Sequence, residues 1–420
     1  MITRPIGSYL MLLSLLSLVA CGGGGGGGGG SGASTSPTSA ATTEYVYVPN
    51  NGSSTVSQFT IGADGSLTPM TNPTVATGSF PLFVIIDPSG KYAYVANHNS
   101  STVSQFTIGA DGSLTPMTNP TVAVGSEPNP PTVGPLDKYV YVTSYGSNSI
   151  SQFTIGADGS LTPMTNPTVA VGSSPVSVTV DPSGKHAYAL NYGGSSISQF
   201  TIGADGSLTP MTNATVAAGS GPLSITVDPS GKYVFVANQG SNNISQYTIG
   251  ADGSLTPMTN PTVATGSFPI SLIVDPSGKY AYVVSLLDNS VWQYTIGADG
   301  SLTPMTNPTV SVGSEPTSLT VGPLGKYVYV ANYESNSISQ FTIGADGSLT
   351  PMTNATVAAG SGPLSITVDP SGKYVYVANH NSSTVSQFTI GADGSLTPMT
   401  NPTVATGSNP GPITATGANK

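Results

Sequence analysis

Arginine and cysteine are nearly absent from this chain of 420 residues, and charged side chains are scarce. The one arginine is Arg4, only 7% of the residues are charged, and the formal net charge is −10. Such a chain lacks the basic stripe that binds phosphate backbones, so we expect no nucleic-acid partner. The one cysteine, Cys21, excludes a disulfide within the chain, so packing and hydrogen bonds must stabilise the fold.

The first 43 residues differ in composition from the rest. Arg4 precedes the apolar stretch "YLMLLSLLSLVA", which is too short to span a bilayer and is typical of a signal peptide. The letters "LVAC", ending at Cys21, resemble the bacterial lipobox, in which the peptide is cut before a cysteine that then carries a diacylglycerol. An ordinary signal peptide followed by an unused thiol is the alternative. We therefore predict a lipoprotein signal peptide at 1–20, then a lipidated Cys21 with a flexible Gly/Ser/Thr-rich tether over 21–43.

Residues 44–420 consist of a repeat of 47 residues. The stretch "IGADGSLTPMTNPTV" begins at Ile61 and recurs almost unchanged, without insertions. The further copies begin at Ile108, Ile155, Ile202, Ile249, Ile296, Ile343 and Ile390. A fixed period in this range indicates stacked units of one supersecondary structure.

One repeat predicts four short strands, which we name A to D in chain order. In the fifth copy, "LSITV" (223–227) is strand A, "YVFVA" (233–237) is strand B and "ISQYTI" (244–249) is strand C. The tight turns "DPSGK" and "GADG" separate A from B and C from D. Strand D contains Pro257, which cannot donate to a hydrogen-bond ladder, so D should form the edge of its sheet.

The two ends of the array predict a closed ring. The array begins with a strand B at Tyr45 and ends with an in-register strand A, "PITATGANK" (412–420). One blade must therefore combine strands from both termini. We predict an all-β fold, an eight-bladed β-propeller of four-stranded antiparallel blades, with seven blades plus a spare unit as the alternative.

The motifs "KYVYVAN", "VDPSGKY" and "GADGSLTP" resemble those of YVTN-type and lactonase-like propellers, the family named after 6-phosphogluconolactonase. The resemblance covers about nine tenths of the chain and implies a propeller that hydrolyses a lactone. A phosphorylated lactone, however, needs cationic groups, typically arginine. The mature chain has none, and its eight lysines all lie beside the A–B turns. We therefore expect that 6-phosphogluconolactonase activity is absent.

The differences among the repeats predict a binding face. The A–B and C–D turns hardly vary, whereas the B–C loops and the residue before the D–A proline do, and in an antiparallel blade these two variable sets share one face. Duplication followed by random drift is the alternative interpretation. The candidate ligand-binding residues are Phe80, His98, Glu127, Tyr145, Tyr192, Phe268, Glu315, Tyr333, Glu334 and His380.

We predict no catalytic residue, no metal site and no cofactor. Glu127 and Glu315 lie four blades apart, which is too far for a glycosidase-like carboxylate pair. His98 and His380 lack the spacing of zinc ligands. The aspartates of the tight turns suit hydrogen bonds to their own backbone better than calcium.

Three functions remain open at this stage. The leading hypothesis is a lipid-anchored scaffold of the cell envelope, at the outer membrane or cell surface, which binds a protein or a glycan through the variable face. The alternative is a lactonase-family hydrolase that acts on an unphosphorylated lactone or sugar in the central funnel. The third is a purely structural surface protein.

Overall fold

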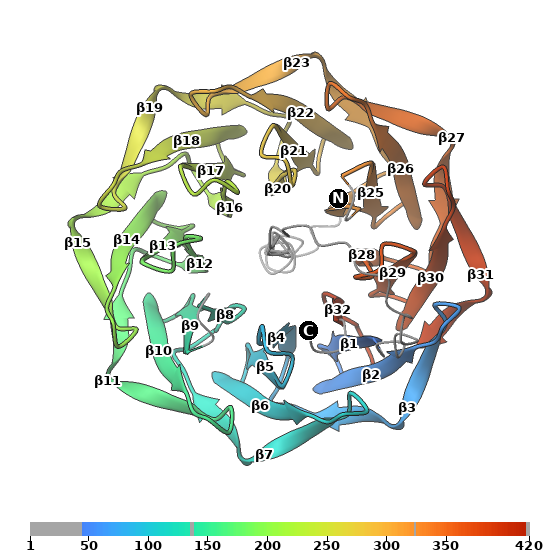
Figure 1. Cartoon of the computed structure of the whole chain (residues 1–420), viewed down its shortest axis with the longest axis horizontal. Coiled ribbons are helices and arrows are strands. Elements are labelled where there is room, and N and C mark those ends of the chain that lie inside the picture. The colour runs from blue at the N-terminus through green and yellow to red at the C-terminus, as the bar shows by residue number, and fades with distance from the viewer. Residues whose placement is uncertain (1–43, 135–137, 323–324, 417–420) are drawn as a thin grey trace, which may run out of the picture.

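Eight sheets, each of four antiparallel strands, stand as blades around a common axis (Figure 1). The structure, a computed structural model, describes residues 44–134, 138–322 and 325–416. The predicted signal peptide, Cys21 and the tether lie outside these residues. The predicted eight-bladed propeller is confirmed, and the alternative of seven blades with a spare unit is wrong. Among the described residues no helix is long and apolar enough to cross a membrane.

The four strand positions recur in every blade, from A at the axis to D at the rim. The A strands are β4 (Pro81–Ile86), β8 (Thr132–Val133), β12 (Pro175–Val180), β16 (Pro222–Val227), β20 (Pro269–Val274), β24 (Pro316–Val321), β28 (Pro363–Val368) and β32 (Thr414–Thr416). The B strands are β1 (Glu44–Asn50), β5 (Tyr92–Asn97), β9 (Tyr139–Ser144), β13 (His186–Asn191), β17 (Tyr233–Asn238), β21 (Tyr280–Ser285), β25 (Tyr327–Asn332) and β29 (Tyr374–Asn379).

The outer half of each blade is as regular as the inner half. The C strands are β2 (Thr55–Ile61), β6 (Thr102–Ile108), β10 (Ser149–Ile155), β14 (Ser196–Ile202), β18 (Asn243–Ile249), β22 (Ser290–Ile296), β26 (Ser337–Ile343) and β30 (Thr384–Ile390). The D strands are β3 (Leu67–Ala76), β7 (Leu114–Ala123), β11 (Leu161–Ala170), β15 (Leu208–Ala217), β19 (Leu255–Ala264), β23 (Leu302–Ser311), β27 (Leu349–Ala358) and β31 (Leu396–Ala405). Strand D is the edge of every sheet, as its prolines predict.

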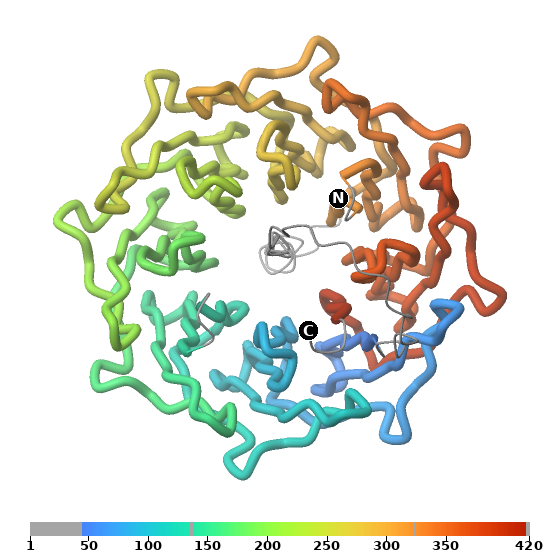
Figure 2. Tube along the Cα trace, in the orientation of Figure 1, coloured from blue at the N-terminus to red at the C-terminus, as the bar shows by residue number. Residues whose placement is uncertain are grey.

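The ring closes through a blade built from both ends of the chain. Strand β32 pairs antiparallel with β1, with Tyr45 opposite Thr416 and Tyr47 opposite Thr414. In Figure 2 the first strands, in blue, lie beside the last, in red. Ile413, just before β32, is 4% exposed and packs with residues of the first and last blades. The predicted closure is confirmed.

The apolar core lies between blades. Strand B is buried on both faces because each sheet is covered by two others; Val46, Tyr47 and Val48 have no exposed surface. In one interface, Tyr47 and Val56 of one blade pack against residues of the next blade. The same arrangement recurs around the ring, so removal of apolar surface from water holds every blade to its neighbours.

A buried glutamine in every C strand links two blades through hydrogen bonds. Gln246 is 1% exposed; its Nε2 donates to the Asn260 carbonyl of its own D strand over 3.0 Å. Its Oε1 accepts from Leu302 N of the next blade at 2.6 Å. The Asn260 carbonyl is within reach because the D strand bulges between Pro257 and Thr262. The same two bonds occur at Gln58, Gln105, Gln152, Gln199, Gln293, Gln340 and Gln387.

The "GADG" turn is a second contact between blades. Gly112 has φ +80°, and a Cβ built there would lie 2.2 Å from the ring of Tyr45 in the preceding blade. The Tyr45 hydroxyl donates to the Ala110 carbonyl at 2.9 Å. Asp111 accepts hydrogen bonds from the amide and hydroxyl of Ser113, as expected for a turn aspartate. The aspartate and the second glycine of this turn therefore have a conformational and a packing reason, respectively.

We predict that Gln246→Met destabilises the fold by about 2–4 kcal/mol. Methionine keeps the apolar contacts but leaves the Asn260 carbonyl and the Leu302 amide without their partner, and an unsatisfied buried polar group costs roughly 1–3 kcal/mol. Chemical denaturation measures the loss. Thr248→Val, in the same strand, removes only an exposed hydrogen bond of 3.4 Å and is the control. Equal stability of the two variants would contradict the role of the glutamine.

Candidate functional site: the loop face

The B–C loops and the D–A connections form one face of the ring, which we call the loop face; the A–B and C–D turns form the opposite turn face. Hydrogen bonds join the two variable sets directly. His98 N donates to the Phe80 carbonyl at 2.9 Å, and Tyr333 N donates to the Glu315 carbonyl at 2.8 Å. The predicted grouping of the variable residues on one face is thus what the structure has.

The variable residue before each D–A proline adopts left-handed backbone geometry in all eight blades. Only two of these residues are glycine; the others include Phe80, Glu127, Phe268 and Glu315, with φ between 52° and 63°. Left-handed geometry costs a residue with a side chain roughly 1–2 kcal/mol. The chain therefore keeps aromatic and acidic side chains where glycine would fold more easily, and such strained positions often occur at functional sites.

The first residue of the B–C loop reaches the next blade. The Nδ1 atoms of His98 and His380 lie 3.4 and 3.0 Å from the carbonyls of Pro128 and Pro410. Asn51 makes the same contact through Nδ2. These two candidate histidines thus sit in equivalent bridging positions. The described residues contain no cluster of three or more His, Cys, Asp or Glu side chains that could hold a metal.

Two of the candidate tyrosines, Tyr192 and Tyr333, also bridge blades, and each lies opposite a glycine. Tyr192 donates to Gln239 Oε1 at 2.8 Å, and its ring lies 3.3 Å from a Cβ built on Gly221. Tyr333 faces Gly362 in the same way, with 3.1 Å from its ring to the built Cβ. Burial raises the pKa of Tyr192, and the neighbouring Tyr145 adds to this. Tyr145 and Tyr192 are half-buried and belong to one apolar cluster.

The glutamates Glu127 and Glu315 lie on opposite sides of the ring, as their separation of four blades predicts. Phe80, before β4, and Phe268, before β20, lie opposite each other in the same way. Glu127 precedes β8 and Glu315 precedes β24. Figure 1 shows the blade of β8 and β9 opposite the blade of β25 and β26, to which β24 belongs. Glu127 is exposed. Glu315 is half-buried, and its pKa is raised by this burial and by the nearby Glu334. The structure brings Glu315 and Glu334 together, and neither is near Glu127. Phe80 lies beside His98, with ring centroids 6.1 Å apart.

The innermost strands offer hydroxyl groups and backbone but no ionisable side chain among the described residues. Thr226 donates to the Leu272 carbonyl of the next blade at 3.0 Å, and Ser224 Oγ accepts from Leu272 N at 3.2 Å. These side chains protect the open inner edges of the sheets. Near the axis the described strands supply neither a general base nor a cation for an anionic substrate.

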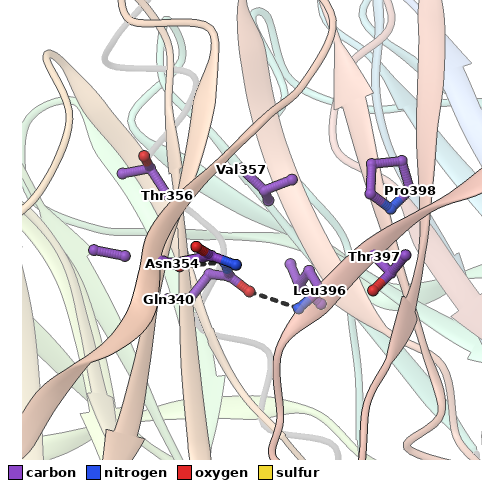
Figure 3. A pocket seen from close by; sticks show the side chains of 8 residues that line it. Gln340, Asn354, Thr356, Val357, Leu396, Thr397 and Pro398 are labelled. Atoms are coloured by element: carbon purple, nitrogen blue, oxygen red, sulfur yellow. Dashed lines mark hydrogen bonds between the residues drawn. The ribbon is translucent and has the colours of Figure 1, made fainter.

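A groove of about 420 Å³ lies at the rim between β27 and β31. It is lined by Gln340, residues 354–357 and residues 396–398, all uncharged. Figure 3 shows the Gln340 side chain hydrogen-bonded to Leu396 at its base. The groove therefore belongs to the blade-to-blade glutamine contact and offers no reactive group.

The family model described as "Lactonase, 7-bladed beta-propeller" matches residues 38–127 and 109–409. The chain belongs to this lactonase family. No curated protein matches it. The family model describes seven blades, whereas this lactonase-family member has eight.

Several solved structures share the fold of this lactonase-family chain. A putative 6-phosphogluconolactonase from Bacteroides fragilis is 22% identical, with a TM-score of 0.64 over 91% of this chain and 100% of that one. The periplasmic gluconolactonase PpgL from Pseudomonas aeruginosa is 20% identical, with a TM-score of 0.61 over 90% and 100%. Apo AztD from Citrobacter koseri is 13% identical, with a TM-score of 0.64 over 91% and 100%. At these identities the likeness shows the fold alone.

The sequence reasoning missed two residues of the loop face. Gln239 occupies the same loop position as His98 and Tyr333 and accepts the Tyr192 hydrogen bond, so alignment of the repeats could have included it. Leu287, in the sixth blade's loop, is 64% exposed and is the one exposed large apolar side chain among the described residues. The departure of "SLLDNS" from the other loops was its signal.

We predict that the His380→Asn variant loses less stability than the unchanged protein when the pH falls from neutral to mildly acidic. Burial lowers the pKa of His380 below its ordinary value of 6.5. As the pH falls, the unfolded chain therefore binds a proton at this histidine before the folded chain does. The stability that neutral His380 contributes is fully present above about pH 6.5 and is lost as the pH falls further. Asparagine keeps the bridge, as Asn51 does to the Pro81 carbonyl at 2.6 Å. The measurement is the melting temperature from pH 7.5 to 5.0; identical pH dependence in the two proteins contradicts the assignment.

Proposed function

We propose that this lactonase-family propeller is a binding protein of the cell envelope that holds a protein or a glycan on its loop face. The observation that carries the proposal is the separation of fixed and variable residues. The C–D turns, the glutamine bridges and the D strands hardly change between blades, while most of the charged and aromatic side chains that differ lie on the loop face. A ring that only filled space would not need strained Phe and Glu residues there.

A lipid anchor and an outward-facing loop face complete the proposal. The "LVAC" motif supports acylation of Cys21. Strand β1 begins at Glu44, opposite Ile61 at the edge of the turn face, so a tether would join the ring on that face. The described lysines are exposed there and would favour anionic headgroups, although the turn aspartates weaken this attraction. Release of the protein from membranes by Cys21→Ser tests the anchor; unchanged membrane retention speaks against it.

We expect loop-face substitutions, and not turn-face substitutions, to abolish binding. The purified domain from residue 44 onward is first tested on a glycan array and by crosslinking to envelope proteins. The ligand so identified is then titrated against Tyr145→Ala and Glu334→Ala on the loop face and against Lys232→Ala on the turn face. Glu334 and Lys232 are exposed, so their substitutions should shift stability by roughly 0.5 kcal/mol or less. Tyr145 is half-buried, so the melting temperature of Tyr145→Ala is measured to confirm that this variant is folded. A ligand whose affinity depends on Lys232 but on neither loop residue would refute the proposal.

Hydrolysis of an unphosphorylated lactone is the second candidate, favoured by the family membership and by the likeness to the periplasmic gluconolactonase. The described inner strands lack an ionisable side chain that could act as a general base, which argues against hydrolysis. A phosphorylated lactone is disfavoured for a second reason, because the described lysines lie on the turn face. The test is the rate of gluconolactone ring opening with and without the purified domain. A rate well above the spontaneous one would favour the hydrolase.

A further inference from the structure

The charge on the loop face is uneven. Its described acidic residues are Glu127, Asp288, Glu315 and Glu334, and it carries no lysine or arginine, because every described lysine lies at an A–B turn. Three of these four carboxylates belong to two neighbouring blades, the sixth and the seventh. Glu127 stands alone on the third. One sector of the face therefore has a concentrated negative field with no basic side chain to offset it.

Hydrogen bonds join the loops that carry these three acidic residues into one continuous strip. Glu315 N donates to Asn289 Oδ1 at 2.9 Å, which ties Glu315 to the loop that holds Leu287 and Asp288. On its other side, the Glu315 carbonyl accepts from Tyr333 N at 2.8 Å. Glu334 N donates to the Ser314 carbonyl at 3.2 Å. We call the strip of Leu287, Asp288, Glu315, Tyr333 and Glu334 the acidic crest.

The crest also carries an exposed large apolar side chain, which the described loops of the other blades lack. Leu287 is 64% exposed, whereas the adjacent Leu286 is buried at 3% in the core. The backbone of the loop is held in place, with Leu287 N bonded to the Ser267 carbonyl and Asp288 Oδ2 accepting from Ser267 N at 2.7 Å. An exposed leucine directly before an aspartate, on a loop with a hydrogen-bonded backbone, suits a partner that offers an apolar group beside a cation.

We propose that the acidic crest binds a basic segment of a partner protein, in which an aliphatic or aromatic side chain adjoins lysine or arginine residues. The apolar residue would cover Leu287, and the cations would pair with Asp288, Glu315 and Glu334. A nearby cation would also relieve the repulsion between Glu315 and Glu334 that helps to raise the Glu315 pKa. A neutral glycan would gain nothing from the carboxylates. The inference rests on the proposed function and narrows it to one sector and one chemistry.

The test uses the purified domain and three labelled synthetic peptides: one that alternates lysine and leucine, one with glutamate for lysine, and one with serine for leucine. Affinity is measured by fluorescence anisotropy at low and at high salt. We expect only the lysine–leucine peptide to bind well, and salt to weaken it. Glu315→Gln combined with Glu334→Gln should weaken it about tenfold, and Leu287→Ser should weaken it roughly threefold.

The matched control is Glu127→Gln, at the same repeat position as Glu315 and with nearly the same φ, 54° against 52°. Melting temperatures confirm that all variants fold. Equal weakening by Glu127→Gln, or full affinity after Leu287→Ser and the double Glu variant, overturns the crest as the site. If a glycan or another partner then binds through Tyr145 while the crest variants keep full affinity, the crest inference fails and the proposed function stands.

Discussion

The fold depends on the contact between one blade and the next, and the buried glutamine of strand C is its most demanding part. An amide in an apolar interface is tolerated only when its donor and acceptor are both used. Gln246 achieves this with two backbone groups, one in its own blade and one in the next. The Asn260 carbonyl lies in the bulge of its own D strand, and Leu302 N lies at the start of the next blade's D strand. A change in that strand would break contacts in two interfaces, which accounts for the near-identity of the outer repeat.

Closure of the ring imposes the same geometry on all eight interfaces between blades. In a ring of eight blades every interface must turn the chain by the same amount, because an error in one would have to be absorbed by the others. The terminal strand β32 completes the last interface through only a few residues. Nearly identical turns and D strands are the simplest way to meet the condition. The loop face does not have to meet this condition with identical residues. Side chains there can be exchanged in complementary pairs, such as Tyr192 with Gly221.

The strands and turns that build the blades relate the chain to its family, but they do not determine its activity. Membership of the lactonase family reflects the strands and turns that build blades. The described inner strands carry hydroxyls already engaged between blades and no charged group. The loop face instead carries partly exposed tyrosines, strained acidic and aromatic positions and one exposed leucine. Binding therefore needs fewer additional assumptions than hydrolysis.

The sequence alone determined the number of blades, the strand order and the edge position of strand D, because periodicity, turn residues and proline act locally and repeat. It also placed the variable residues on one face, since loop position follows from strand direction. Only the tertiary structure decided what surrounds each side chain. The left-handed geometry of Glu315, the bridge from His380 to Pro410 and the strip that joins Leu287 to Glu334 depend on contacts between residues of neighbouring blades. Such contacts arise when blades pack, and no pattern within one repeat contains them.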